Sequence, residues 1–439
     1  MPTPLYDAVK KYADQEPFRF HMPGHKGGPV PLMAELKWMT PIDLTELPPT
    51  GNLYEGGEPF ASAQALWAKE FGFEYCQFLT GGSTQGIHTG LALCCPPGSK
   101  VLVDRNCHRA VFNAMALLDL EPIYLERPWL GEESLIGPIS PETVENMLCQ
   151  CPKIKTVCIT SPTYAGVLSD VGTISRLVHA HGGKLFVDGA HGAHLPFLGL
   201  APFWEADGVV VSAHKTLPTL GQGALLFTNG MDPDRVRQLA SVFGTSSPSY
   251  PIMASMDTAR EWMVKWGHHD YRRTALRVAQ LREQFPSLRE KRLSLDPTRF
   301  VLSVQNGPAF TRALEKRGVY PEMEDGGHVV FICTPFDNSF SLSALERRLE
   351  ELREQMGPCP PIPAPPLPEQ AMSPRQALFA PSRVWPLEDC EGEVAACQIA
   401  PYPPGVPVVA PGEVISKKSL AYLKQIGYNI KSEVRIAAL

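Results

Sequence analysis

Two residues with chemically useful side chains, Asp188 and Lys215, each follow an apolar run that has the character of a buried strand. The run 184–188 ends at the aspartate, and the run 208–212 is closely followed by the lysine. A lysine in a partly desolvated pocket becomes a nucleophile that can form a Schiff base with a carbonyl compound. A buried carboxylate can hold the nitrogen of a heteroaromatic ring in its protonated form. Taken singly, the aspartate could instead cap the next turn, and the lysine could be a solvated loop charge.

A glycine-rich turn between another strand and a helix could hold a phosphate group. Residues 80–86 read Thr-Gly-Gly-Ser-Thr-Gln-Gly, with Gly82, Ser83 and Thr84 at the centre. Glycine allows the backbone to approach a ligand closely, and the start of a helix offers free N–H groups and the positive end of a dipole. A plain strand-to-helix turn with a serine or threonine cap fits the same residues.

His108 follows a further strand-like run, residues 101–104. Its imidazole could lie flat on a heteroaromatic ring, or it could cap a helix or fill a core. All these residues stand just past the carboxyl ends of predicted strands, which is where open α/β sheets bind ligands.

Alternating strand-like and helix-like runs from about residue 75 to 230 must position these side chains. Such alternation indicates βα units and a mostly parallel sheet covered on both faces. We therefore predict an α/β fold. The strand-like runs are 75–80, 100–105, 122–126, 156–161, 184–188, 208–212 and 223–228, and the helix-like runs between the earlier ones include 83–94, 141–149 and 172–181.

The rest of the chain does not continue the alternation of strand-like and helix-like runs. A long helical pattern covers about 253–283, residues 297–353 look like strands with a charged helix at 341–353, and prolines then exclude regular structure. We expect an N-terminal segment at 1–60, a large cofactor-binding domain at 61–265 and an α+β C-terminal region at 266–439 with a proline-rich connection near 357–368.

Composition excludes several classes of function. The net charge of −6 argues against a nucleic-acid partner, and the sequence contains neither a membrane-spanning apolar run nor a secretory signal. The eleven cysteines match no zinc spacing, so we expect no metal and interpret them as reduced thiols in the cytoplasm.

The phosphate turn, the histidine, the strand-end aspartate and the Ser-x-His-Lys sequence at 212–215 occur in an order that resembles fold-type I pyridoxal-5′-phosphate (PLP) enzymes. More narrowly, the chain resembles the Orn/Lys/Arg decarboxylase family, in a small form without the N-terminal response-regulator-like domain of the large inducible members. The sequence of segment 51–57 differs from the one that is commoner in this family. Further stretches that carry the resemblance are 20–27, 43–46, 246–250, 373–375, 401–405 (Pro-Tyr-Pro-Pro-Gly) and 411–413 (Pro-Gly-Glu).

The resemblance implies an aspartate-aminotransferase-like large domain with smaller α+β C-terminal parts, and it implies roles for individual residues. Lys215 would carry PLP as a Schiff base, Asp188 would pair with the pyridine nitrogen, and His108 would stack on the ring, with His191 at the other face or edge. Either Lys215 or His108 would return a proton to Cα, so that the expected catalytic residues are Lys215, Asp188 and His108. The residues implied at the phosphate are Gly82, Ser83, Thr84, Ser212 and His214, joined from a partner subunit by Thr245 and Ser246.

The implied activity is decarboxylation of a basic amino acid, which is arginine, lysine or ornithine, in a homodimer or higher homo-oligomer with shared active sites. An aminotransferase, another lyase or a racemase would use the same cofactor, and a non-catalytic regulatory protein could keep the fold. The guanidinium of arginine is best bound by a carboxylate through two parallel hydrogen bonds, whereas the ammonium group of lysine or ornithine can be bound by a single acceptor. The candidate carboxylates are Glu413, Glu322, Glu324 and Asp325, although a surface or capping role is the commoner one for such residues.

Overall fold

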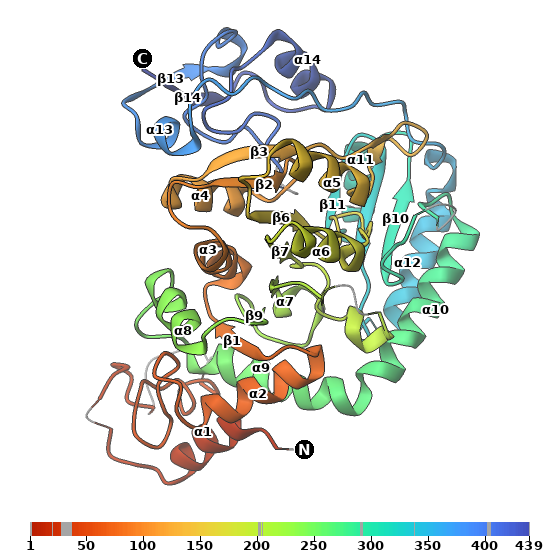
Figure 1. Ribbon diagram of the computed structural model, residues 1–439. Coiled ribbons are helices and arrows are strands. Elements are labelled where there is room, and N and C mark those ends of the chain that lie inside the picture. Colours follow the sequence, from red (N-terminus) through yellow and green to blue (C-terminus); the bar gives the residue numbers. More distant parts are fainter. Residues whose placement is uncertain are drawn as a thin grey trace. The chain divides into compact units, whose positions relative to one another are not determined.

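The computed structural model describes residues 2–19, 21–27, 37–200, 203, 205–289, 293–337, 339–401 and 405–438 (Figure 1). Phe20 and Tyr402 to Pro404, which belong to two of the motifs named above, lie outside these described residues. The chain divides into two compact units. The first contains Met1–Cys94 and Lys184–His269, and the second contains Cys95–Gly183 and Asp270–Leu439.

Four buried strands form the sheet of the first unit. They are β1 (Tyr75–Leu79), β9 (Ala224–Thr228), β8 (Gly208–Val211) and β7 (Lys184–Asp188), in that order across the sheet. Strand β9 runs antiparallel to both β1 and β8, and β7 is parallel to β8. The carboxyl ends of β1, β7 and β8 therefore share one edge with the start of β9.

Helix α3 (Gly82–Cys94) packs closely on this sheet because two of its glycines face the strands. A Cβ atom on Gly86 would lie 2.3 Å from a methyl group of Val210, and one on Gly90 would lie 2.0 Å from the ring of Phe186. Atoms cannot approach so closely, so glycine at these i, i+4 positions allows the helix to lie against β7 and β8. This contact fixes the start of α3 beside the strand ends.

In its described part, the first unit has five further helices, of which α1 packs on α2 and α9, as the lower part of Figure 1 shows. The indole of Trp67 donates to the carbonyl of Met256 at 3.1 Å and links two of these helices. They are α1 (Pro4–Asp14), α2 (Phe60–Phe71), α7 (Ala213–Thr216), α8 (Pro233–Val242) and α9 (Tyr250–Trp262), with a 3-10 turn at Leu195–Leu198 and a π-helical turn at Met263–Gly267.

The second unit contains an all-parallel set of strands and three small antiparallel sheets. The parallel strands are β6 (Thr156–Thr160), β2 (Lys100–Asp104) and β3 (Glu121–Leu125), in that order. The antiparallel sheets are β4–β5 (Trp129–Leu130 and Leu135–Ile136), β10–β12–β11 (Arg299–Ser303, His328–Ile332 and Met323–Glu324) and β13–β14 (Ser382–Pro386 and Glu433–Ala437).

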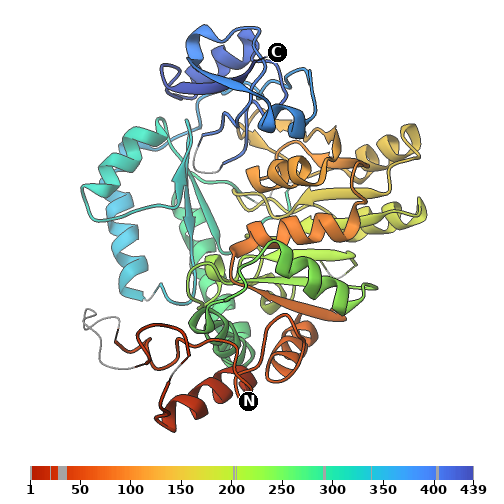
Figure 2. The same cartoon turned by 90° about the vertical axis from the view of Figure 1, so that its left-hand side faces the viewer.

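Helices cover these sheets and close separate apolar cores. One core joins α10, α11 and α12 to β10 and β12, which lie together in Figure 2, and another lies near the C-terminus around Ile399 and Ile436. Residues 357–369 form neither helix nor strand. The helices are α4 (Arg109–Leu118), α5 (Pro141–Gln150), α6 (Val171–Ala180), α10 (His268–Gln284), α11 (Gly307–Glu315), α12 (Ser339–Glu351), α13 (Pro374–Phe379) and α14 (Lys417–Gln425), with 3-10 turns at Arg353–Gln355 and Leu387–Asp389.

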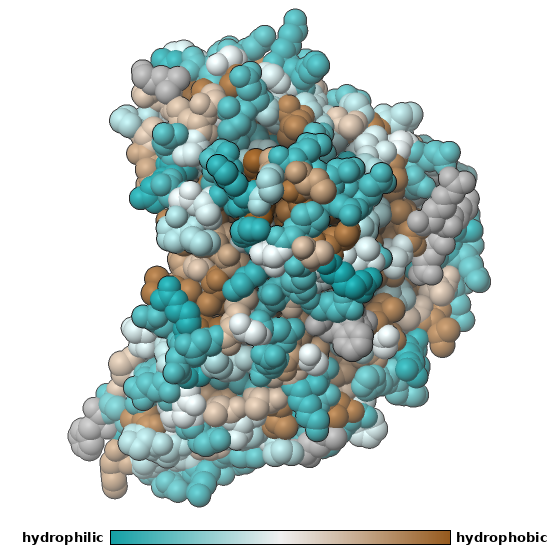
Figure 3. Space-filling view, viewed as in Figure 1, coloured by the Kyte–Doolittle hydropathy of each residue, from teal (hydrophilic) through white to brown (hydrophobic). Residues whose placement is uncertain are grey.

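The predicted α/β class is confirmed, because β9 alone opposes the direction of its neighbours in the first unit and the three strands of the second are parallel. The helical stretch expected at about 253–283 is helical throughout, as α9 and α10 with the π-helical turn between them. The face in Figure 3 is mainly hydrophilic with scattered apolar groups, as is usual for globular proteins. Among the described residues, no helix has both the length and the apolar character needed to cross a bilayer.

Candidate active site

The edge of the first unit's sheet gathers most of the residues predicted to bind a cofactor. Asp188 is the last residue of β7 and is 2% exposed, and Ser212, directly after β8, is fully buried. One Asp188 oxygen accepts the N–H of Ala190 at 3.2 Å, which orients the carboxylate at the strand end. The parallel pairing of β7 and β8 brings these two residues to the same edge, as the sequence predicts.

Lys215 lies in the short helix α7, directly beyond β8. Its Nζ atom is 2.9 Å from Nε2 of His191, which lies on the turn that follows Asp188 and is almost completely buried. The amine and the imidazole can therefore share a proton. The sequence analysis placed His191 near the cofactor ring, and the structure adds its direct contact with the lysine.

The glycine-rich turn forms the start of α3 and meets the β8 edge. The Ser212 hydroxyl donates to the Ser83 hydroxyl at 2.8 Å, and the N–H of Gly82 donates to the carbonyl of Gln222 at 2.9 Å. The first N–H groups of a helix have no carbonyl partner within the helix, so those of Ser83 and Thr84 can face an anion. Two hydroxyls and a helix start are thus available together.

His214 stands beside Lys215 with its ring held by the start of β9. Its Nδ1 lies 2.9 Å from the carbonyl oxygen of Gly223, an acceptor, so Nδ1 carries the proton and Nε2 is left for another partner. Burial lowers the pKa of His214 below its ordinary value, the bond to Gly223 raises it, and the positive charge of Lys215 lowers it further. An anion next to Nε2 would reverse this balance and favour the charged ring.

Gln85 shapes the turn, and the sequence analysis assigned it no role. Its side-chain oxygen accepts the N–H of Gly81 at 2.9 Å, and its amide nitrogen donates to the carbonyl of Ala240 at 2.8 Å. Gly244 lies against the same amide, because a Cβ there would be 2.3 Å from the Gln85 nitrogen. A glutamine three residues after a Gly-Gly pair is the sequence signal that could have indicated this role.

Thr245 and Ser246 follow Gly244 and are exposed in the single chain. The Thr245 hydroxyl accepts the N–H of Ser247 at 3.2 Å, which shapes a polar turn. Their predicted contact with the phosphate of a partner subunit stays a prediction.

His108 belongs to the second unit and is not among the residues gathered within the first. It is the N-cap residue of α4, where its Nδ1 accepts the N–H of Ala110 at 3.2 Å. His108 therefore caps the helix through Nδ1, which is one of the two roles considered from the sequence. Its stacking role stays a prediction.

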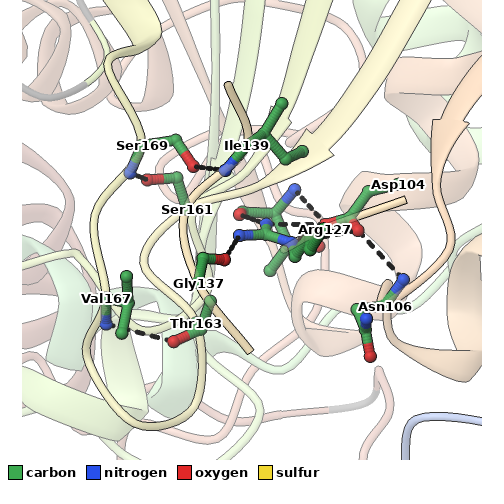
Figure 4. Close-up of polar contacts among 10 residues, drawn as sticks. Asp104, Asn106, Arg127, Gly137, Ile139, Ser161, Thr163, Val167 and Ser169 are labelled. Carbon is green, nitrogen blue, oxygen red and sulfur yellow. Dashed lines mark hydrogen bonds and ion pairs between the residues drawn. The ribbon is translucent and has the colours of Figure 1, made fainter. Parts of the chain in front are cut away.

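A buried ion pair joins the end of β2, which precedes His108, to the residue Arg127 that follows β3 (Figure 4). Both side chains, Asp104 at the end of β2 and Arg127, are completely buried, with a shortest N–O distance of 2.7 Å. Arg127 also donates to the carbonyls of Gly137, at 3.1 Å, and Thr160. With a carboxylate and two carbonyls as acceptors, the guanidinium is well satisfied, as a buried charge must be.

Serine and threonine side chains hold the neighbouring loop after β6 (Figure 4). The Ser161 hydroxyl accepts the N–H of Ser169 at 3.1 Å, and the Ser169 hydroxyl accepts the N–H of Ile139 at 3.0 Å. The Thr163 hydroxyl accepts the N–H of Val167 at 3.0 Å and closes the turn between them. These hydrogen bonds fix the loop that follows Thr160, whose carbonyl accepts from Arg127.

The carboxylates considered for substrate binding are also in the second unit. Glu413 is fully buried, pairs with Arg105 at 2.7 Å and accepts the N–H of Ala410 at 2.7 Å. Glu322 accepts the hydroxyl of Tyr164. Burial raises the pKa of Glu413, opposed by the charge of Arg105. Glu413 thus has a structural partner already, and the substrate role of either glutamate stays a prediction.

Two family models match this chain. The family model described as "Orn/Lys/Arg decarboxylase, major domain" matches residues 3–305, and that of the C-terminal domain matches residues 363–431. This chain belongs to the Orn/Lys/Arg decarboxylase family. The prediction of an amino-acid decarboxylase is thereby confirmed.

Individual relatives agree with this family assignment. The arginine decarboxylase of Bacillus subtilis (strain 168) is 29% identical over 455 residues, which cover 96% of this chain and 93% of the relative. The solved structure of the E. coli constitutive lysine decarboxylase superposes with a TM-score of 0.82 at 20% identity and covers 99% of this chain and 82% of its own. A structure titled "SPT with PLP" has a TM-score of 0.56 at 13% identity over 67% of this chain and 76% of its own.

The Orn/Lys/Arg decarboxylase family and the shared fold indicate PLP as the cofactor. The residues at the edge of the first unit's sheet fit this group chemically. A lysine amine suits the aldehyde, the buried carboxylate of Asp188 suits a protonated ring nitrogen, and the Ser83 and Ser212 hydroxyls with the start of α3 suit a phosphate.

Proposed function

We propose that this family member is a PLP-dependent decarboxylase of a basic L-amino acid, which is arginine, lysine or ornithine, and that it releases CO2 and the corresponding amine for polyamine synthesis. The observation that carries the proposal is the contact between Lys215 and His191 at a sheet edge that also presents Asp188, Ser83 and Ser212. This set supplies a nucleophilic amine, a proton partner, a buried carboxylate and an anion site within one unit.

Each residue has a role that follows from its position. Lys215 would hold the cofactor through its amine, and Asp188 would keep a proton on the ring nitrogen. Ser83, Thr84, Ser212 and His214 would hold the phosphate, with Gln85 keeping the turn in shape.

Bound PLP supplies the electron sink that accepts the electron pair left at Cα when CO2 departs. Lys215, no longer bonded to the cofactor, would then carry as an ammonium the proton that it returns to Cα, and would be left as the neutral amine. His191, 2.9 Å from Nζ, can take up or give back that proton, which keeps the amine in the form each step requires. General acid–base help of this kind contributes roughly 100- to 10,000-fold to a rate.

The subunit arrangement and location complete the proposal. Thr245 and Ser246 are exposed in the single chain and follow Gly244, which is tied to the phosphate turn through Gln85. We propose a homodimer in which they reach the phosphate of the partner. We also propose a cytoplasmic location, supported by eleven cysteines that form no disulfide with one another in the described part of the chain.

A direct assay tests the proposed function. The purified protein with PLP is incubated separately with arginine, lysine and ornithine, and both CO2 and the amine product are measured. We expect equal amounts of the two products from at least one of the three amino acids, and none from the Lys215→Ala variant. Transfer of the amino group to a keto acid, with no CO2 released, would contradict decarboxylation.

A further inference from the structure

A cysteine, a histidine and an aspartate meet in the second unit, in a region that the proposed decarboxylase chemistry does not use. Asp325 and His328 lie at the two ends of the turn Asp-Gly-Gly-His that leads into β12. Cys359 belongs to the proline-rich connection, which here crosses the turn. The three residues come from segments about thirty positions apart and are brought together only by folding.

The carboxylate of Asp325 is firmly oriented toward the histidine. Its Oδ1 accepts the N–H groups of Gly327 at 2.9 Å and His328 at 2.7 Å, and Nδ1 of the His328 ring lies 3.1 Å from both carboxylate oxygens. The His328 side chain is 4% exposed, so its ring has little freedom. A carboxylate on Nδ1 fixes that nitrogen as the proton carrier and directs Nε2 to another partner.

Cys359 lies beside the ring, since its thiol is among the groups that raise the pKa of His328, and the thiol donates to the carbonyl of its neighbour Pro360 at 3.3 Å. The thiol also lies against the turn, because a Cβ atom on Gly327 would be only 1.8 Å from its sulfur. The Ser134 hydroxyl holds the connection in place by donating to the carbonyl of Pro360 and accepting the N–H of Ile362, both at 3.2 Å. Glycine at 327 is thus what allows the sulfur to reach the histidine.

The charges around the ring favour a protonated imidazole. Burial alone lowers the pKa of His328, but the bonds to Asp325 and Cys359 outweigh burial and raise this pKa to about 10. Tyr422 of α14 also faces Asp325, and burial together with that carboxylate raises the pKa of Tyr422 to about 12. The tyrosine is therefore neutral at physiological pH and adds no charge that would oppose the imidazolium.

We propose that Cys359, His328 and Asp325 form a nucleophilic thiol site that reacts reversibly with small-molecule disulfides. The Cys359 thiolate, stabilised by the His328 imidazolium, attacks one sulfur of the disulfide. A new S–S bond forms as the original one breaks, so that the cysteine is oxidised, one half of the reagent stays attached and the other half leaves as a thiolate that takes a proton from water. The Cys359 sulfur lies so close to Gly327 that a group attached to it would not fit there. Modification would therefore move the proline-rich connection away from the Asp325–His328 turn.

A second cysteine–histidine pair in the same unit provides a matched comparison. Exposed Cys149 has its sulfur 3.6 Å from Nε2 of His181. Nδ1 of His181 faces the carbonyl oxygen of Leu177 at 2.9 Å, so a neutral acceptor stands where Asp325 stands behind His328. The two pairs differ in the carboxylate of Asp325 behind His328. We therefore expect Cys359 to be the more reactive thiol at low pH.

The test measures how fast each cysteine of the full-length protein is modified by 2,2′-dithiodipyridine at pH 6 and pH 8, by peptide mass spectrometry. Because the reactive species is the thiolate, the rate of an ordinary thiol falls about 75-fold between pH 8 and pH 6. We expect a fall of this order at Cys149 and a fall of less than about fivefold at Cys359. The ratio of two rates at the same sulfur cancels any difference in accessibility.

Two variants separate a reactive site from a merely structural turn. In His328→Gln the pH dependence at Cys359 should become as steep as at Cys149. Asp325→Asn should have the same effect in part, and it keeps the test open if the first variant does not fold, because the Asp325 side chain is 41% exposed. A steep pH dependence at Cys359 in the unmodified protein, or full reactivity at pH 6 in both variants, would overturn the proposal. The outcome does not depend on the decarboxylase activity.

Discussion

The Nζ atom of Lys215 lies 2.9 Å from Nε2 of His191, and the two residues come from the turns that follow adjacent parallel strands. This contact makes the lysine part of a proton-sharing pair instead of an isolated loop charge. It also explains why the two turns must be held in register, since a small shift of β7 against β8 would separate the atoms.

Lys215→Ala should abolish both turnover and the covalent link to the cofactor, while leaving the fold intact because the side chain is only half-buried. The measurements are near-visible absorbance of the purified protein and mass spectrometry after borohydride reduction. Lys184→Ala, at an exposed position, is the control and should keep both properties. A borohydride-trapped cofactor at normal occupancy in Lys215→Ala would show that another residue holds PLP.

Asp188→Ala should weaken cofactor binding and slow turnover by several orders of magnitude. Removal of one partner of a buried charge pair costs roughly 3–5 kcal/mol, and each ~1.4 kcal/mol that falls on the barrier changes the rate tenfold. PLP titration and single-turnover kinetics measure the two effects separately. A turnover number near that of the unmodified enzyme would mean that a different group supports the ring nitrogen.

Asp104→Ala is the matched control for Asp188→Ala, because both aspartates end a strand of the pattern Lys-x-x-Val-Asp. Asp104 is paired with Arg127, so its loss leaves a buried guanidinium charge without its counter-ion. We expect a loss of stability of roughly 3–5 kcal/mol, measured by urea unfolding. Any folded Asp104→Ala enzyme should keep its PLP affinity, in contrast to Asp188→Ala.

The stability of the first unit should depend on pH through Asp257, which is completely buried under the start of α1. Its Oδ2 accepts the N–H groups of Leu5 at 2.9 Å and Tyr6 at 3.1 Å, and burial raises its pKa from 3.8 to about 6. Between these values the folded state binds more protons than the unfolded state, so the free energy of unfolding falls as the pH rises. Two pKa units correspond to about 3 kcal/mol.

Asp257→Asn cannot titrate and should therefore gain stability relative to the unmodified protein, by up to about 3 kcal/mol, as the pH rises from 4 to 6. Urea unfolding of both proteins across this range checks the slope. Asp170→Asn is the control, because hydrogen bonds from Thr173 lower the pKa of Asp170, and its window lies below this range. Parallel curves for Asp257→Asn and the unmodified protein would contradict the prediction.

Shared active sites should appear as complementation between inactive subunits. A heterodimer of Lys215→Ala with a Thr245→Ala/Ser246→Ala subunit has one site with both lesions and one with neither, so partial activity should return on mixing. Ser246→Ala alone should weaken PLP binding by about one charge-assisted hydrogen bond, roughly 1.5–3 kcal/mol. A fully active monomer, established by sedimentation at assay concentrations, would rule out shared sites.

The sequence by itself determined the strands, the helices between them and the residues that follow each strand, because these depend on local periodicity and turn chemistry. It therefore predicted Asp188, Ser212 and Lys215 at one sheet edge. The boundaries predicted for the three parts of the chain stay a prediction.

Only the tertiary structure decided which side chains meet. Asp104 and Asp188 have the same local sequence, yet Asp104 is bound by Arg127, which comes 23 residues later. Glu413 is bound by Arg105, 308 residues away, and Gln85 reaches Ala240 across 155 residues. Such pairings arise where the fold brings distant segments together and excludes water, so that a buried polar group must find a partner among them.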